Sequence, residues 1–272
     1  MKKYLVIFLL FTLALGLASR GLAQERLKIS STTSTDNTGL FQVLNPPFEK
    51  RFGCRVDVVA VGTGKALKIG EMGDSDVVFV HSRPAEDAFV AAGHGVNRRD
   101  IMYNDFIIIG PANDPAGIRG TRDAKKALTA IAQAGAPFIS RGDDSGTHKK
   151  EKSLWKKADV VPKGRWYSEA GQGMGAVIQI ANEKLAYTLA DRGTYLAYRN
   201  KTSLEILCEG DPDLFNPYGI IAVNPAKHPH VNYIMAMAYI GWVTSPEGQK
   251  IIREFGKEKF GQALFIPMVI PK

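Results

Sequence analysis

Short runs of β-branched residues alternate with segments of helical periodicity along almost the whole chain, and this alternation restricts its fold more than any other feature. Alternation of this kind builds a mostly parallel sheet with helices on both faces. A chain of 272 residues is long enough for one domain or two. The sequence therefore predicts an α/β fold.

The predicted strands are short and bounded by glycine, proline or polar residues. They cover Leu27–Ser30, Val56–Val61, Asp76–Val80, Phe106–Ile109, Pro137–Ser140, Ser203–Cys208 and Tyr218–Val223. The predicted helices carry apolar residues three and four positions apart. They cover Gly39–Arg51, Lys65–Glu71, Ala85–Ala92, Arg122–Gln133, His148–Lys157, Met174–Ala181, Val231–Val243 and Pro246–Phe255.

Two apolar extended segments are candidates for crossing between two lobes. Tyr103–Pro111 and Phe215–Pro225 are each bracketed by asparagine, proline and glycine. As a pair they would carry the chain out of one lobe and back, and would form a hinge. We expect lobe I to contain residues 24–105 and 222–272 and lobe II to contain residues 106–221, each a mostly parallel sheet flanked by helices, with a cleft between them.

The first 23 residues have the parts of an export signal. Lys2 and Lys3 form a basic start, Tyr4–Leu17 is almost entirely apolar, and Gly21-Leu22-Ala23 places small residues at a cleavage site. The apolar run is shorter than the ~20 residues that span a bilayer. We therefore expect cleavage near Ala23 rather than a membrane anchor.

Charge and cysteine content narrow the class of protein. Three basic residues and no acid leave with the signal, so the formal charge falls from +8 to +5. The mature chain lacks the Lys/Arg blocks typical of nucleic-acid binding, and a mildly basic chain suits an anionic ligand. Cys54 and Cys208 either form a disulfide or stay as buried thiols. No cysteine or histidine spacing typical of a metal site is present, and His228 and His230 are predicted to lie in a surface loop.

The stretch Ser31–Gly39, STTSTDNTG, begins with five hydroxyl side chains in succession. It lies where the first predicted strand passes to the first predicted helix, which is where open α/β sheets bind ligands. Helix N-termini offer unpaired backbone N–H groups there, and neutral hydroxyls add further donors. The stretch is suited to an oxyanion, although one of its residues would suffice as a helix N-cap.

A second strand-to-helix turn, Val61–Lys65, has the sequence VGTGK. Its glycines allow the backbone to approach a ligand closely. It is not a nucleotide P-loop, because Val59 and Ala66 stand where that motif needs glycine and a hydroxyl residue. The turn is either a second part of the ligand site or a plain connection.

The third stretch, Ser140–Thr147, has the sequence SRGDDSGT and adds an arginine. The planar fork of Arg141 suits tetrahedral oxyanions. At ~4 Å and an effective dielectric of ~20, one charge pair is worth about 4 kcal/mol before desolvation, so this cation would dominate a site. Asp143 would orient the guanidinium; alternatively, Arg141 forms only a surface salt bridge with Asp143 or Asp144.

Three further positions are left open by the sequence. The glycine-rich turn Gly171–Gly175 opens a helix without the dinucleotide spacing, and either contacts the ligand or only begins that helix. Thr188 and Arg192 follow a predicted strand ending. They either reach the cleft or hold it together.

An enzyme is the main alternative to a binding protein. Ser145, His148 and a neighbouring aspartate are the residue types of a hydrolase triad. However, GDDSGTH lacks the GxSxG elbow of α/β-hydrolases. We therefore expect no enzymatic activity.

These loops, in this order behind an export signal, resemble the tungstate-binding (TupA) family of type II periplasmic substrate-binding proteins of ABC importers. Ser31–Ser34 and Gly39-Leu40 are similar to that family's TTTS motif and helix start, with Ser31 where threonine is usual. The segments VHSRPAED, YNDFIIIGP, SRGDDSGTH, GQGMG and YTLADRGTYLAY are similar as well, so the resemblance covers nearly the whole mature chain. The R-x-x-x-S-G-T spacing is also similar to that of phosphate-binding relatives.

The resemblance implies an oxyanion site between two lobes, with no cofactor and no chemical step. It assigns to the ligand Thr32, Thr33, Ser34 and Thr63 from lobe I and Arg141, Ser145, Gly146 and Thr147 from lobe II. It also implies a periplasmic monomer that captures tungstate or molybdate, closes around it at the hinge and delivers it to an ABC permease in the inner membrane.

The identity of the oxyanion stays open between tungstate, molybdate, sulfate and phosphate. Phosphate carries a proton at neutral pH and needs an acceptor, whereas a deprotonated dianion needs donors alone. Asp76, at the start of the third predicted strand, is the candidate acceptor. Because the resemblance points to donors only, we interpret Asp76 as structural.

Overall fold

The computed structural model describes residues 24–269, so the predicted signal of residues 1–23 lies outside the described residues. Eight strands form one sheet, which contains β10 (Ile266–Pro267), β4 (Gly95–Gly110), β9 (Phe215–Val223), β3 (Val77–Val80), β1 (Glu25–Thr32) and β2 (Cys54–Val61) in that order. β7 (Thr188–Asp191) and β8 (Glu205–Cys208) also pair with β4. A separate pair consists of β5 (Phe138–Ser140) and β6 (Tyr167–Glu169).

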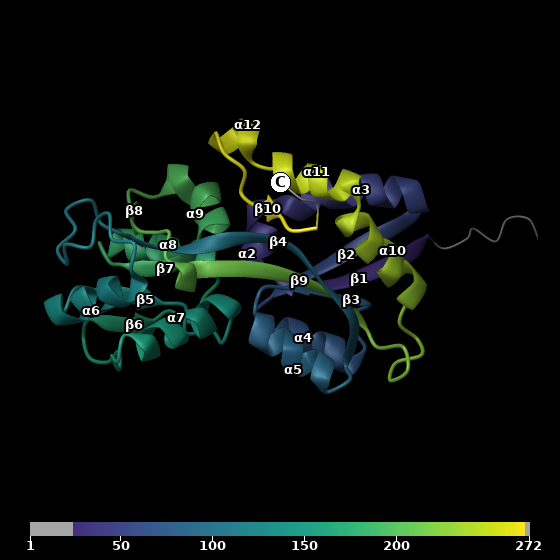
Figure 1. Ribbon diagram of the computed structural model, residues 1–272, viewed down its shortest axis with the longest axis horizontal. Coiled ribbons are helices and arrows are strands. Elements are labelled where there is room, and N and C mark those ends of the chain that lie inside the picture. Colours follow the sequence, from purple (N-terminus) through teal and green to yellow (C-terminus); the bar gives the residue numbers. More distant parts are fainter. Residues whose placement is uncertain (1–23, 270–272) are drawn as a thin grey trace, which may run out of the picture.

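Helices cover the sheet on both sides (Figure 1). They are α2 (Thr33–Thr38), α3 (Leu40–Phe52), α4 (Thr63–Met72), α5 (Arg83–Ala91), α6 (Ala124–Ala134), α7 (Gly146–Lys157), α8 (Met174–Glu183), α9 (Arg192–Tyr198), α10 (Tyr233–Thr244), α11 (Pro246–Glu254) and α12 (Lys257–Phe260). Two short 3-10 helices, η1 (Arg199–Lys201) and η2 (Pro212–Leu214), complete the set. Within residues 24–269, no helix is both long and apolar enough to span a bilayer.

The long strands β4 and β9 join the two halves of the molecule. They run side by side across the middle of Figure 1, between β1–β3 with their helices on one side and α6–α9 on the other. The first part of β4 pairs with β9, from Gly95 opposite Val223 to Asp105 opposite Phe215. Its last residues pair with β7, beginning with Phe106 opposite Asp191.

The α/β class is confirmed, but the sheet is mixed where the sequence predicts mostly parallel strands. β1 pairs in parallel with β2 and β3, and β5 pairs in parallel with β6. Every pairing of β4 and β9 is antiparallel. The physical reason is that one strand carries the chain out and the other carries it back, so the two must run in opposite directions.

The structure also extends two predicted elements. The stretch predicted as a hydroxyl-rich loop contains α2, which ends at Gly39 in the left-handed conformation with φ 86° before α3 begins. β4 begins at Gly95, although the composition of Asn97–Asp100 is typical of a loop. Gly95 and Val96 pair with β9, and after a register shift Arg99 and Asp100 pair with it as well. Tertiary pairing overrides local propensity in this strand.

The core lies on both faces of the central strand. Ile107 and Ile109 pack into one apolar cluster, which runs from β1 and α3 to α8 and α10. Phe106 and Ile108 alternate with them and pack into a second cluster under α6 and α7. Because successive side chains of a strand point to opposite faces, four consecutive apolar residues anchor both clusters.

Candidate oxyanion-binding site

Three strand-to-helix junctions from different parts of the chain meet in the structure. β1 leads into α2, β2 leads into α4, and β5 leads through Arg141 into α7. The backbone N–H of Gly146 donates a hydrogen bond of 2.9 Å to Thr63 Oγ1. The second and third predicted loops are therefore in direct contact.

The first junction uses some of its hydroxyls for its own structure. Ser31 Oγ donates to the carbonyl of Phe79 at 2.7 Å. Thr32 is the N-cap of α2, since its Oγ1 accepts from the N–H of Thr35 at 3.3 Å. The side chain of Thr32 is thus a cap, as the sequence allowed for one residue of this stretch.

Thr33 and Ser34 are the first two residues of α2. Thr33 Oγ1 is buried and accepts or donates no hydrogen bond among the described residues. A Cβ atom placed on Gly173 would lie 3.5 Å from that oxygen, so the glycine-rich turn before α8 approaches this junction closely. Ser34 Oγ lies 3.0 Å from Nε2 of His81.

The third junction buries its arginine. The side chain of Arg141 is 2% exposed and pairs with Asp143 through its Nη2 atom. Burial alone would raise the pKa of Asp143, but the hydrogen bond and positive charge of Arg141 outweigh it and lower that pKa. The alternative of an ordinary surface salt bridge is therefore wrong.

The remaining residues of this junction begin α7. Ser145 is its N-cap, with Oγ accepting from the N–H of His148 at 3.2 Å. The N–H of Ser145 donates to Asp143 at 3.2 Å. Thr147 is buried, and its Oγ1 has no hydrogen-bond partner among residues 24–269.

Three predicted ligand donors share one property. Thr33 Oγ1, Arg141 Nε and Thr147 Oγ1 are buried atoms that make no hydrogen bond within the described part of the chain. Buried polar groups without partners are uncommon in native proteins and each requires an explanation. These three come from the first and third predicted loops, and all are able to donate to an anion.

His81 is a residue of this site that the sequence reasoning did not single out. It follows β3 directly and is buried between Ser34 and Asn216, with Nδ1 3.0 Å from Asn216 Oδ1. Burial lowers the pKa of His81 to about 4; the hydrogen bond with Asn216 opposes this and the charge of Arg141 adds to it. The segment VHSRPAED was the only signal in the sequence that could have indicated it.

Asp191 is a second residue that the sequence reasoning missed. It caps α9 by accepting from the N–H of Thr194 at 2.8 Å, and it is fully buried. Burial raises its pKa, while Thr194 and the charge of Arg141 act in the opposite direction. Asp191 is thus a carboxyl group within electrostatic reach of the predicted anion-binding arginine.

Asp76, the predicted alternative acceptor, is structural. Its carboxylate accepts from the backbone N–H groups of Lys28 and Asn232, each at 2.7 Å. It ties β1 to the start of α10. The interpretation of Asp76 as structural is confirmed.

The residues of the imagined hydrolase triad are not arranged as one. Ser145 Oγ accepts from the backbone of His148, and His148 Nδ1 accepts from the backbone N–H of Asp144 at 3.0 Å. A triad needs a serine-to-imidazole bond and an imidazole-to-carboxylate bond between side chains. Here Ser145 Oγ and His148 Nδ1 each accept a hydrogen bond from a backbone N–H group instead.

Arg192 lies outside the three strand-to-helix junctions and links α9 to β4. It donates two bonds of 2.6 Å to Asp105 on β4 and one of 2.6 Å to Glu209, so it holds α9 against that strand. Thr188 is buried within β7. Of the two roles left open for Arg192, holding the structure together is the observed one.

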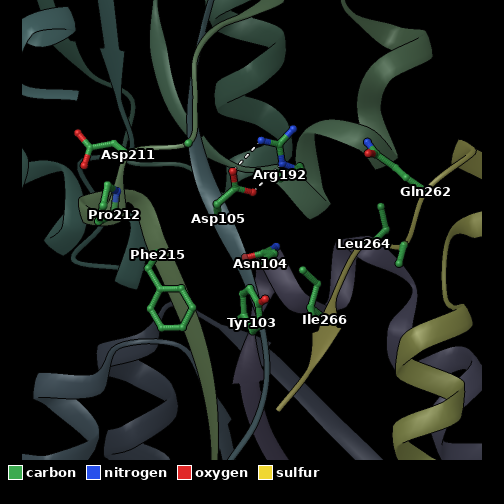
Figure 2. A pocket seen from close by; sticks show the side chains of 12 residues that line it. Tyr103, Asn104, Asp105, Arg192, Asp211, Pro212, Phe215, Gln262, Leu264 and Ile266 are labelled. Carbon is green, nitrogen blue, oxygen red and sulfur yellow. Dashed lines mark hydrogen bonds and ion pairs between the residues drawn. The ribbon is translucent and has the colours of Figure 1, made fainter. Parts of the chain in front are cut away.

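The cavity beside Arg192 is not the predicted site. Figure 2 shows it between Tyr103 and Asp105 of β4, Phe215 of β9 and the C-terminal segment around Leu264. Its volume is about 480 Å³, and none of the eight predicted ligand residues lines it. A smaller cavity of about 330 Å³ is lined by His81 and by Gly146 of the third junction.

The two cysteines are separate in the structure. Cys54 in β2 and Cys208 in β8 are both buried free thiols, so the disulfide alternative is wrong. Among residues 24–269, no group of three or more histidine, cysteine, aspartate or glutamate side chains is placed to hold a metal ion. His228 and His230 each lie 2.9 Å from a backbone carbonyl near the end of α4.

Comparison with known proteins agrees with this architecture. Residues 18–247 match the family described as PBP superfamily domain. The solved structure of the tungstate ABC transporter from Geobacter sulfurreducens is 63% identical, covers 85% of this chain and 99% of its own, and superposes with a TM-score of 0.79. The tungstate binding protein TupA from Desulfovibrio alaskensis G20 is 50% identical over 90% of this chain and 99% of its own, with a TM-score of 0.77.

A curated relative gives the same result from sequence. The tungstate-binding protein TupA of Peptoclostridium acidaminophilum is 49% identical over 247 residues, which cover 90% of this chain and 86% of that protein. The chain therefore belongs to the PBP superfamily and, within it, to the family of these tungstate-binding proteins TupA.

Proposed function

We propose that the protein is the solute-binding component of an ABC importer and that it captures tungstate at the three junctions. The observation that carries this proposal is the set of buried donors Thr33 Oγ1, Arg141 Nε and Thr147 Oγ1, which have no hydrogen-bond partner within residues 24–269. A tetrahedral oxyanion supplies acceptors to such donors and removes the cost of leaving them unpaired.

The electrostatics support an anion of this class. Arg141 is a buried cation, and Asp143, the carboxylate paired with it, is more exposed to solvent, at 17% against 2%. A dianion at ~4 Å from one cation, at an effective dielectric of ~20, gains about 8 kcal/mol before desolvation. The N-terminus of α7 adds backbone N–H groups and a favourable helix dipole on the same side.

Tungstate is preferred over the other oxyanions for two reasons. Three relatives, 49%, 50% and 63% identical to this chain, are named for tungstate. Asp76, the acceptor that a protonated phosphate would need, is occupied by two backbone N–H groups. Molybdate has the same charge and nearly the same size, so we expect it to bind as well, whereas sulfate and phosphate bind much more weakly.

Binding is proposed to close two lobes about β4 and β9. Lobe I contains residues 24–105 and 222–272, and lobe II contains residues 106–221. The change of partner along β4, from β9 to β7 between Asp105 and Phe106, supports a boundary at that point. Hinge closure around a ligand is a recurrent mode of periplasmic binding proteins.

The cellular role follows from the family and the predicted export signal. We expect a periplasmic monomer, cleaved near Ala23, that presents its closed form to an ABC permease in the inner membrane. No chemical step and no cofactor are part of this role. Amino-terminal sequencing of the exported protein, together with its mass in solution, tests the cleavage site and the monomeric state.

The binding function is tested by isothermal titration of the anion-free mature protein with tungstate, molybdate, sulfate and phosphate. Arg141→Gln is compared with Arg119→Gln, which removes an exposed arginine paired with Glu205. Tight tungstate binding that Arg141→Gln abolishes and Arg119→Gln leaves unchanged supports the proposal. Absence of binding to all four anions, or an unchanged affinity in a folded Arg141→Gln protein, overturns it.

A further inference from the structure

A chain of buried hydrogen bonds leads from the candidate site to both hinge strands. Ser34 Oγ lies 3.0 Å from His81 Nε2, and His81 Nδ1 lies 3.0 Å from Asn216 Oδ1. Asn216 Nδ2 donates to Asn104 Oδ1 at 2.6 Å. All four residues are buried, and the hydrogen-bond chain links the first turn of α2 to β9 and β4.

The two asparagines fix the direction of this chain. They lie directly opposite each other in the β4–β9 ladder, with Asn104 opposite Asn216. Because the Nδ2 group of Asn216 donates to Asn104, its Oδ1 atom is the one that faces His81. An amide oxygen only accepts, so His81 Nδ1 carries a proton.

The protonation of the other ring nitrogen of His81, Nε2, determines whether Ser34 donates or accepts. His81 is buried near the positive charge of Arg141, which keeps the imidazole neutral. A neutral imidazole with a proton on Nδ1 has a bare Nε2 that accepts a hydrogen bond. The hydroxyl of Ser34 therefore donates a hydrogen bond to His81 Nε2.

The ring itself is held in place by packing. It stacks on Tyr218 of β9 with centroids 4.8 Å apart and an interplanar angle of 23°. A Cβ atom placed on Gly146 would lie 3.3 Å from both the Cε1 and the backbone oxygen of His81. His81 thus contacts the third junction as well as the first.

We propose that His81 is a positioning residue for oxyanion binding, which accepts a hydrogen bond from the hydroxyl of Ser34 and ties the first junction to the paired asparagines of the hinge strands. The inference rests on the proposed function and gives Ser34 a different role from the predicted one. Ser34 acts through its bond to His81 and not as a hydroxyl donor to the anion. The free hydroxyl donor of that junction is Thr33.

The first test determines the tautomer of the His81 ring in the absence of ligand. Nitrogen-15 spectra of the histidine rings in the anion-free protein, assigned with His81→Phe, report the tautomer of His81. We expect the proton on Nδ1, and a shift of the Nε2 signal in Ser34→Ala. A proton on Nε2, or an Nε2 signal that Ser34→Ala does not move, overturns the inference.

The second test is a double-mutant cycle on tungstate affinity. His81→Phe keeps the ring stack and removes both hydrogen bonds, and His94→Phe is the matched control, since His94 packs beside Phe89 away from the site. We expect Ser34→Ala to weaken tungstate binding about tenfold, as for loss of one buried hydrogen bond, and His81→Phe to weaken it at least as much, because it also loses the bond to Asn216. The double variant should then be no weaker than His81→Phe. Additive losses, or an unchanged affinity in His81→Phe, overturn the inference.

The two proposals fail in different ways. A wild-type protein that binds no tungstate removes the proposed function, and the inference falls with it whatever the tautomer. A wild-type protein that binds tungstate tightly while His81→Phe binds equally well removes only the role of His81. Circular dichroism and thermal melting establish that each variant is folded, and the ring spectra decide the inference if His81→Phe does not fold.

Discussion

Gly146 donates its backbone N–H to Thr63 Oγ1 across 83 positions of sequence, at a distance of 2.9 Å. The bond joins the first residue of α7 to the first residue of α4, so it closes the contact between the two proposed lobes. A hydroxyl that accepts from the opposite lobe still has its own proton to donate. Thr63 is therefore placed both to stabilise the closed arrangement and to contact an anion.

Thr63→Val tests the contribution of this bond to closure. The substitution keeps the shape of the side chain but leaves the Gly146 N–H without its partner, at a cost of about 1 kcal/mol. We expect tungstate binding to weaken five- to tenfold by isothermal titration. Thr129→Val, on α6 with a hydroxyl bonded only to the carbonyl of Lys125, serves as the control and leaves affinity unchanged.

Gly146→Ala tests the close approach of the two lobes. An added methyl group would lie 3.1 Å from Thr63 Oγ1 and 3.3 Å from two atoms of His81, which is tighter than ordinary contact. Overpacking of this kind costs about 1–3 kcal/mol, so we expect affinity to fall at least about fivefold. In Gly241→Ala on α10 the methyl group meets no atom within 4 Å, and that variant retains wild-type binding. Equal affinities for the two variants would contradict a closed site at Gly146.

Asp143→Asn tests the orientation of Arg141. The carboxylate holds the guanidinium, and Arg141 lowers the pKa of Asp143 against the opposing effect of burial. We expect tungstate affinity to fall by about tenfold, the loss of one charge-assisted hydrogen bond. Asp144→Asn is the control, because Asp144 is exposed and lies 3.3 Å from Lys149.

The same pair predicts a pH dependence of stability. A lowered pKa in the folded state contributes stability above the ordinary value of 3.8, and this contribution is lost as the pH falls through the lowered pKa. Thermal melts of wild type and Asp143→Asn should differ at neutral pH and converge in strong acid. A difference that stays constant across that range would argue against the Arg141–Asp143 pair.

Glu151 predicts a stability change with the opposite sign. It is buried on α7, where it accepts from Trp155 at 3.1 Å and Tyr167 at 2.8 Å, and burial raises its pKa to about 7 from 4.5. The contribution of protonated Glu151 to stability is fully present below pH 4.5. It is lost as the pH rises to about 7, because Glu151 ionises at a lower pH in the unfolded chain than in the folded protein.

Glu151→Gln should remove this loss. At pH 8 we expect the variant to exceed wild type by at most about 3 kcal/mol in free energy of unfolding, and the advantage should vanish near pH 4. Urea denaturation at several pH values measures it. Glu183→Gln, an exposed residue of α8, should follow the wild-type curve; a wild-type profile for Glu151→Gln would show that Glu151 ionises normally in the fold.

The two cysteines should behave as protected free thiols. Cys54 and Cys208 are buried in different strands, and burial raises the pKa of both, to about 12 for Cys208. We expect no alkylation under native conditions and the mass of two added groups after unfolding without reductant. A single disulfide would instead leave the unfolded chain unlabelled.

Local patterns were sufficient for most elements and for the loops of the candidate site. β-Branched runs and helical periodicity indicated the strands and helices around the three junctions, and Arg141 stood out because its chemistry is distinctive at any position. The resemblance to the family assigned Thr33, Arg141 and Thr147 to one site, which hydrophobic periodicity could not do. These three supply the buried donors without partners.

Other features could not be read locally. The polar start of β4 is a strand only because β9 lies beside it, and the hydroxyl of Ser31 is bonded to the carbonyl of Phe79, 48 positions away. His81 is part of the site because it contacts Ser34 and Asn216, which are 47 and 135 positions away in the sequence. A hydroxyl's partner depends on which distant atom lies within about 3 Å, and spacing along the chain does not determine that.

The sequence by itself determined the α/β class, the strand-to-helix loops and the donor chemistry gathered in them, because propensity, periodicity and charge are properties of neighbouring residues. Only the tertiary structure decided which of those donors stay unpaired, that Arg141 is buried, that the sheet is mixed about β4 and β9, and that Asn104 and Asn216 face each other. These are outcomes of packing between segments far apart in the chain. Burial and hydrogen-bond partners are set when such segments meet, and that meeting turns a row of hydroxyls into caps, links and free donors.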